Sequence, residues 1–170
     1  MAVRPIVLYG HPALREKSAE VDRVDQETKD IVADMIATLK DAQGLGLAAN
    51  QIGLAKRIFL VDMSGIDPDE DVRVFINPVI LETSGETEYE EGCLSFPDIY
   101  ETITRAATVK IRALNLDGEE YELQADGMLA RVILHEYDHI EGKLFIDYFS
   151  PMAKQLISGK LRKLKAASAA

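Results

Sequence analysis

The stretch Leu134-His135-Glu136-Tyr137-Asp138-His139, with the pattern H-E-x-x-H, organises the interpretation of the whole chain. If the stretch is helical, His135 and His139 leave the same face, because side chains at positions i and i+4 lie one above the other. Two such imidazoles can bind one metal ion, and Glu136 then lies close enough to act on a water molecule without being a ligand. The stretch therefore predicts a metal site on a helix, although so short a pattern also occurs on helices that bind no metal.

The surrounding residues 126–141 are predicted to form one helix that is buried in the fold and ends at Gly142. Apolar residues fall on more than one of its faces: Met128, Leu129, Val132, Ile133 and Ile140. Histidine and carboxylate side chains in such surroundings cost free energy unless they are paired or bound to a metal. The apolar context therefore favours the metal interpretation.

A metal site of this kind needs a third ligand, and the sequence after His139 holds no histidine and only Glu141 and Asp147 as acids. Glu141 is expected to point away from the histidine pair. Upstream, the strongest candidate is Cys93, the only cysteine, although a lone cysteine is most often a small buried apolar residue. Two imidazoles and a thiolate would leave one position for water, as in catalytic sites, and would tolerate Fe(II), Co(II), Ni(II) or Zn(II).

Composition limits the remaining classes of function. The 170 residues are about right for a single domain covering residues 1–170, with 47% hydrophobic and 28% charged residues. The formal net charge of -10 argues against broad nucleic-acid binding by the main body, yet no acidic residue follows Asp147. One cysteine excludes an intrachain disulfide, and no apolar run suits a signal peptide or a membrane span. A cytoplasmic protein is the expectation.

The remaining periodicities predict an α+β fold, with antiparallel or mixed β-sheets wrapped around the central metal-binding helix. Further helices are predicted over residues 25–43 and 150–166, the latter basic, and strands over 57–63 and 72–81. Residues 101–124 are predicted to form a hairpin with its turn at residues 115–118. The acidic run of residues 82–91 is interpreted as a solvated edge, and His11 as a surface or turn histidine.

Residues 44–53 contain three glycines and two alanines, so the backbone here can approach other groups closely. The segment can be a tight connection from helix to strand, or a substrate-binding loop whose backbone pairs with a peptide-like ligand. It is not a P-loop, because no Gly-Lys-Ser/Thr sequence follows it.

Three separated stretches together resemble the signature motifs of the peptide deformylase family, in the same order and with similar separations. They are Gly44-Leu45-Gly46-Leu47-Ala48-Ala49-Asn50-Gln51, Glu91-Gly92-Cys93-Leu94-Ser95 and His135-Glu136-Tyr137-Asp138-His139. The resemblance extends over nearly the whole chain, and Phe96-Pro97 is similar to the bacterial type 1 class. It implies a metal-dependent hydrolase that removes the formyl group from the formyl-methionine of newly synthesised polypeptides.

The resemblance also implies roles for individual residues. The implied ligands of one divalent metal ion, Fe(II) natively with Zn(II), Ni(II) or Co(II) as substitutes, are Cys93, His135 and His139. A metal-bound water would attack the formyl carbonyl, and Glu136 would pass its proton to the leaving amine. The metal, the Gln51 amide and the Leu94 backbone N–H would stabilise the oxyanion.

Substrate binding is implied for two groups of residues. Gly44, Gly46 and Gly92 would pair with the substrate backbone as an added strand. Leu45, Met128 and Val132 would line the pocket for the methionine side chain.

Three positions bear on departures from the family pattern. Leu134 stands where many members carry a glutamine, and it is expected to face away from the ligands. Arg131 is expected at the pocket rim, and Asp138 is hypothesised to pair with Arg105.

Three alternatives remain from the sequence. The basic C-terminal helix is either a solvated surface or, as in bacterial relatives, a contact with the ribosome, with no membrane or sequence-specific nucleic-acid binding expected. H-E-x-x-H alone would also suit a zinc-dependent endopeptidase. A protein with a purely structural metal site is the third, although such a site wants four ligands.

Overall fold

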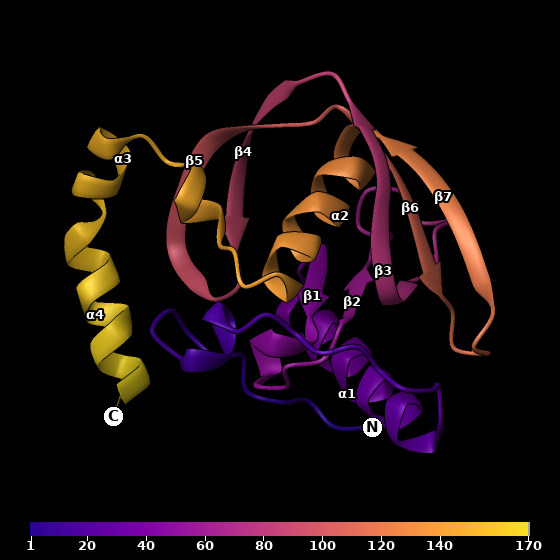
Figure 1. Cartoon of the computed structure of the whole chain (residues 1–170). Coiled ribbons are helices and arrows are strands. Elements are labelled where there is room, and N and C mark those ends of the chain that lie inside the picture. Colours follow the sequence, from indigo (N-terminus) through magenta and orange to yellow (C-terminus); the bar gives the residue numbers. More distant parts are fainter. Residues whose placement is uncertain (170) are drawn as a thin grey trace.

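The computed structural model describes residues 1–169 and has the α+β architecture that the sequence predicts (Figure 1). Five strands form an antiparallel sheet in the order β1-β2-β3-β6-β7, and β4 and β5 form a second, two-stranded sheet. The strands are β1 (Gly46–Ala48), β2 (Ile58–Val61), β3 (Arg73–Ser84), β4 (Thr87–Cys93), β5 (Phe96–Arg105), β6 (Thr108–Leu114) and β7 (Glu120–Asp126). The α-helices are α1 (Gln26–Ala42), α2 (Gly127–Ile140), α3 (Pro151–Leu156) and α4 (Ser158–Ala169). Short 3-10 helices are η1 (Pro12–Arg15), η2 (Ala49–Ile52) and η3 (Phe145–Tyr148).

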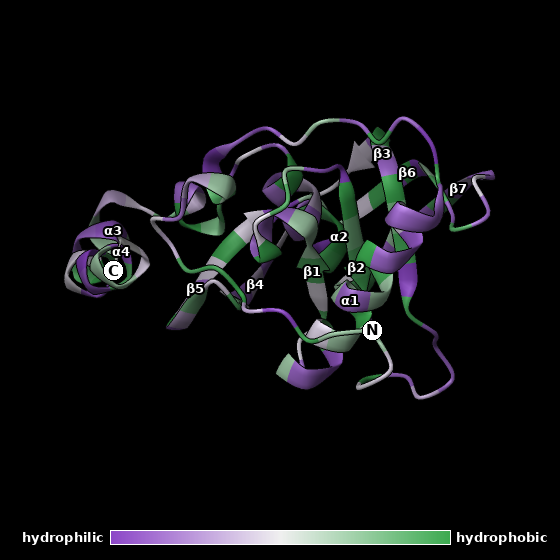
Figure 2. Ribbon diagram, turned by 90° about the horizontal axis from the view of Figure 1, so that it is seen from below, coloured by the Kyte–Doolittle hydropathy of each residue, from purple (hydrophilic) through white to green (hydrophobic). Residues whose placement is uncertain are grey.

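Helix α2 lies between the two sheets, as expected for the central helix (Figure 1). Strand β6 shows why the larger sheet faces it: Val109, Ile111 and Ala113 are buried and alternate with more exposed residues. These side chains share one core cluster with Ala130 and Ile133 of α2. Figure 2 shows apolar residues concentrated around β2 and α2, with polar residues on the outer loops.

Helix α1 begins as predicted, because the Asp25 side chain accepts a hydrogen bond from the backbone N–H of Thr28 at 3.0 Å. It ends at Ala42, one residue before the predicted bound, and Gln43 takes the left-handed conformation that ends many helices, with φ 55°. The buried face of α1 packs on a second core cluster that includes residues of β1 and β2.

Two strand predictions need correction. Residues 102–104 belong to β5 and pair with β4, so they are not part of the hairpin that β6 and β7 form. The acidic run is not only a solvated edge: it covers the end of β3 and most of β4, and Glu91 is buried. Strand β3 is irregular at Asn77, which has φ 49°, and its register with β6 shifts between Ile76 and Val79.

The predicted helix over residues 150–166 is wrong as a single element, because Ile157 separates α3 from α4. Ser150 caps α3 by accepting from the backbone N–H of Ala153 at 3.1 Å. Both helices stand at one side of the molecule (Figure 1). Helix α4 is attached there through Leu161 and Leu164, which pack on the cluster that contains Phe96.

Residues 1–24 are largely irregular, and His11 caps η1 by accepting from the backbone N–H of Ala13 at 3.1 Å. Two of its backbone N–H groups donate to loops of the site: Val7 to the carbonyl of Gln51 at 2.8 Å, and Tyr9 to that of Ser95 at 3.1 Å. Within the described part of the chain, every helix is too short or too polar to cross a bilayer.

Candidate active site

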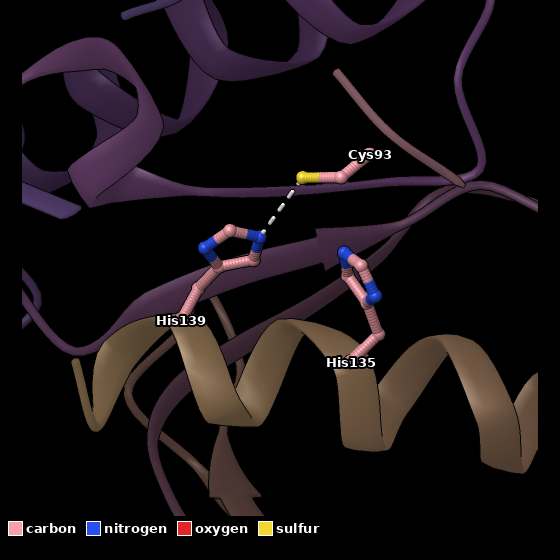
Figure 3. Close-up of side chains that lie close together, drawn as sticks. All are labelled: Cys93, His135 and His139. Carbon is pink, nitrogen blue, oxygen red and sulfur yellow. Dashed lines mark hydrogen bonds between the residues drawn. The ribbon is translucent and has the colours of Figure 1, made fainter. Parts of the chain in front are cut away.

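Cys93, His135 and His139 converge on one point, as the sequence predicted (Figure 3). One ligand atom from each residue lies within 4.8 Å of the others, and His139 Nε2 is 3.3 Å from Cys93 Sγ. Both imidazoles rise from one face of α2 toward the sulfur. Two imidazoles and one thiolate are a donor set that suits a transition metal, so these residues fit a single metal ion.

The sulfur is positioned by a tight turn. Cys93 ends β4 and is the register partner of Phe96 at the start of β5, so only Leu94 and Ser95 connect the strands. The histidines come from the face of α2 opposite Ile133 and Ala130, which pack on the large sheet. Two elements far apart in sequence therefore meet at the site.

Glu91 orients His135 from behind. Its Oε1 lies 2.8 Å from His135 Nδ1, which leaves Nε2 of the ring as the ligand atom. Arg105 donates to both carboxylate oxygens of Glu91, at 2.6 and 3.1 Å, and Arg131 donates to Oε2 at 2.5 Å. Burial alone would raise the pKa of Glu91, but hydrogen bonds from His135 and Arg105 lower that pKa to about 2, so the carboxylate is charged.

Sequence reasoning missed the importance of Glu91, which it counted with the solvated acids. The available signal was its spacing: Glu91 is two residues before Cys93, so in a strand both side chains share a face. Asn50 was also missed, and its Nδ2 donates to the backbone carbonyl of His139. Burial lowers the pKa of His139, which keeps its imidazole neutral, as a metal ligand must be.

Gln51 is buried, and its amide orientation is fixed by its neighbours. The backbone N–H of Ala48 donates to Gln51 Oε1 at 2.9 Å, which directs Nε2 toward Ser95 Oγ at 3.2 Å and Cys93 Sγ at 3.6 Å. The side-chain amide is therefore a donor held beside the sulfur. Ser95, fully buried, is a further site residue that the sequence did not single out.

Glu136 is 4% exposed, and no hydrogen-bond partner is found for its Oε1 among the described residues. Its Oε2 is 4.0 Å from His135 Nε2. Burial raises the pKa of Glu136 to about 7. A Cβ on Gly46 would lie 2.6 Å from Glu136 Oε2, so only glycine fits beside this carboxylate.

A cavity of about 580 Å³ opens in front of these groups. The residues predicted from the sequence that line it are Gly44, Leu45, Gly46, Gln51, Gly92, Cys93, Leu94, Met128, Val132, His135 and Glu136. His139 is not among the lining residues. Ile66, Tyr89 and Tyr100 also line the cavity and were not predicted. The arrangement combines a metal-binding donor set, a buried carboxylate and an amide donor at one end of a partly apolar groove.

The departures noted in the sequence have clear positions. Arg131 lines the cavity, which agrees with the expected place beside the pocket, but it is only 5% exposed because its guanidinium is directed inward to Glu91. Leu134 packs in the core cluster of the large sheet. Arg105 donates to Asp138 at 2.8 Å, which confirms the hypothesised pair.

A family model described as polypeptide deformylase matches residues 3–155. The peptide deformylase of Chromohalobacter salexigens is 45% identical over 164 residues, which are 96% of this chain and 95% of that protein. That of Clostridium botulinum is 50% identical over 147 residues, 86% of this chain and 97% of that protein. The crystal structure of a peptide deformylase from Legionella pneumophila matches with a TM-score of 0.90 and 39% identity, covering 99% and 98% of the two chains. With the site geometry and these full-length similarities in agreement, the chain belongs to the polypeptide deformylase family.

Proposed function

We propose that Cys93, His135 and His139 hold one divalent metal ion with which this chain, as a peptide deformylase, removes the formyl group from nascent polypeptides. The observation that carries the proposal is the convergence of three ligand atoms within 4.8 Å of one another. A cation bound there supplies Lewis acidity and lowers the pKa of coordinated water.

Glu136 is proposed as the general base and acid. It lines the cavity, is next to a proposed ligand in sequence, and has a carboxylate oxygen without a partner among the described residues. From there Oε1 can accept a proton from the attacking water and return it to the leaving amine.

Oxyanion stabilisation is assigned to Gln51 and Leu94. The support for Gln51 is its fixed orientation, since Oε1 is occupied by the Ala48 N–H and Nε2 faces the sulfur of Cys93. Leu94 lines the cavity and stands in the turn directly after the proposed ligand Cys93, which supports assigning its backbone N–H to the oxyanion.

The substrate is proposed to lie along the cavity. Its methionine side chain is assigned to the apolar patch formed by Leu45, Met128 and Val132. Gly44, Gly46 and Gly92 are assigned to the substrate backbone, since their missing side chains let another strand approach. The residues that line the cavity come from segments spread between residues 44 and 136, so we infer that residues 1–170 form one catalytic domain.

The decisive experiment combines metal analysis with a deformylation assay on formyl-Met-Ala. Glu136→Gln is expected to keep the metal and to lose about 10²- to 10⁴-fold in turnover. Cys93→Ser is expected to lose metal affinity. Substantial residual turnover in Glu136→Gln would contradict the assigned base, and cleavage of internal peptide bonds would favour the endopeptidase alternative.

Fe(II) is proposed as the native metal, in a cytoplasmic enzyme. A thiolate with two imidazoles accepts Fe(II), and a reducing compartment would protect both the iron and the single cysteine from oxidation. Metal analysis of protein purified without oxygen tests this, and Zn(II) alone under those conditions would contradict it.

The basic helix α4 is proposed to bind the ribosome, where formylated chains emerge. Arg162 and Lys163 are exposed on α4 and have no acidic residue after them in the chain. Arg162→Glu with Lys163→Glu is expected to reduce co-sedimentation with ribosomes and to spare hydrolysis of formyl-Met-Ala. The matched control is Lys29→Glu with Lys40→Glu on α1, and equal co-sedimentation of both variants would reject the proposal.

A further inference from the structure

We propose that Arg131 is a positioning residue that sets the distance between the proposed ligand Cys93 and the proposed ligands His135 and His139. The inference rests on the proposed metal-binding function of these three residues. It starts from the fact that the cysteine and the histidines belong to two separate parts of the fold.

Cys93 lies on the β4–β5 hairpin, and the histidines lie on α2. The hairpin forms its own two-stranded sheet and has no ladder hydrogen bonds to the five-stranded sheet. On one side it packs through Phe96, Ile99 and Ile103 on apolar residues that follow α2. On the side that faces α2, buried charged side chains make the connection.

Arg131 makes this connection from the helix. Its Nη1 donates to Glu91 Oε2 at 2.5 Å and to the carbonyl of Ile103 at 3.2 Å. Its Nη2 donates to the carbonyl of Thr87 at 2.9 Å and to Thr87 Oγ1 at 3.0 Å. One planar guanidinium therefore holds both strands of the hairpin at once, which the single ammonium of a lysine cannot do.

Arg105 makes a second connection in the opposite direction. It starts on β5 of the hairpin and donates to Asp138 on α2 at 2.8 Å, while also pairing with Glu91. Along α2, Arg131 lies one turn before His135 and Asp138 lies about one turn after it. His135, whose own bond to Glu91 also joins α2 to the hairpin, is thus flanked by two arginine anchors. Arg131 is the one that holds the part of the hairpin formed by Thr87 and Ile103.

The burial of Arg131 strengthens the argument. At 5% exposure its charge costs free energy unless it is paired, and its hydrogen-bond partners, Glu91 included, lie on the hairpin. Without Arg131, Glu91 keeps Arg105 and His135, so the imidazole remains oriented while the hairpin is loosened. The expected defect is therefore in ligand spacing rather than in the chemistry of Glu136.

The test compares Arg131→Met with wild type by Co(II) binding, by the thiolate-to-cobalt charge-transfer absorption, and by hydrogen exchange of the metal-free protein. Loss of an interaction that supports metal ligands typically costs 10- to 100-fold in metal affinity, and that is the expected weakening for Co(II). Amides of β4 and β5 should exchange faster, and Arg131→Lys should fall between Met and wild type.

Arg57→Met is the matched control. Arg57 is also buried, at 8% exposure, and also contacts α2, through the carbonyl of Ile140 and the carboxylate of Glu141. It touches neither Glu91 nor the hairpin. Its loss should lower stability without faster exchange in β4 and β5.

The outcomes separate this inference from the proposed function. If wild type binds no Co(II) or lacks the charge-transfer band, the ligand set itself fails. If wild type shows the band and Arg131→Met matches it in affinity and exchange, Arg131 has no positioning role. If Arg131→Met does not fold, Thr87→Val replaces it in the test. Thr87 is exposed, and this variant removes only the hydrogen bond from Arg131 Nη2 to Thr87 Oγ1. It should weaken Co(II) binding in the same direction by a smaller factor, and no weakening would overturn the inference.

Discussion

Replacing Gly46 with alanine should damage catalysis by displacing the side chain of Glu136. The added Cβ would lie 2.6 Å from Glu136 Oε2, 2.8 Å from Cγ and 2.9 Å from Cδ. Because Cγ is also too close, turning the carboxylate does not relieve the clash, and the whole side chain must move. Reaching ordinary van der Waals contact at 3.4 Å requires a displacement of about 0.8 Å.

The size of the effect follows from that displacement. Misplacing a catalytic group by about 1 Å can cost roughly 10²-fold in rate, which corresponds to about 2.7 kcal/mol of transition-state stabilisation. The loss should include kcat for formyl-Met-Ala, in addition to any rise in KM from the proposed pairing of Gly46 with the substrate backbone. Bound metal should stay at the wild-type level, because the three atoms nearest to the new methyl group all belong to Glu136 and not to a proposed ligand.

Gly65→Ala is the matched control, since a Cβ at that exposed position would meet no atom within 4 Å. It should leave kcat and KM unchanged. The reasoning is refuted if Gly46→Ala retains wild-type kcat, or if it loses metal in proportion to its activity, since the defect would then lie in the ligands and not in Glu136.

Three further predictions concern the site and the core. Glu91→Gln should destabilise the fold by about 3–5 kcal/mol in urea unfolding, because it leaves the buried charge of Arg131 without a carboxylate partner and leaves Arg105 with Asp138 alone; a loss below about 1 kcal/mol would contradict the network. Tyr121→Phe should cost about 1 kcal/mol, since the Tyr121 hydroxyl donates to the Val74 carbonyl at 2.6 Å. Burial raises the pKa of Tyr121 to about 12. The contribution of the hydroxyl to the free energy of unfolding is therefore full below its unfolded pKa of about 10 and is lost as the pH rises toward 12. Unfolding of wild type and Tyr121→Phe between pH 9 and about 12 measures how the stability difference between them declines. Chelation should abolish turnover and lower Tm, added Co(II) should restore both, and Cys93→Ala should show no comparable rise in Tm on adding Co(II).

The convergence of the site was predictable because helical spacing and donor chemistry act locally. His135 and His139 had to share a face once α2 formed, and the lack of a downstream ligand directed attention to Cys93. The α+β class followed in the same way from alternation and helical periodicity in segments such as β6 and α1.

The errors arose where tertiary contacts override local pattern. Glu91 stands among exposed glutamates, and only the approach of Arg105 and Arg131 makes its burial possible. Residues 102–104 alternate like any strand, so their pairing with β4 could not be chosen over β6 without the register. No proline marks the break between α3 and α4 at Ile157. Gly159, two residues later, is the only nearby residue with a low helix propensity.

The contacts that hold the metal-binding side chains have a consequence for how the protein handles ions. Glu91 fixes the ring of His135, Asn50 holds the backbone of His139, and Gln51 faces Cys93, all through hydrogen bonds within the chain. In small zinc domains the ion itself drives folding, so removing it unfolds the chain. Here the same side chains are also held by contacts within the chain, so one cation is expected to exchange for another without unfolding the protein. The ion found in a purified sample would then depend on the metals present in the surrounding solution. Measured activity would depend on metal supply as well as on the amount of enzyme.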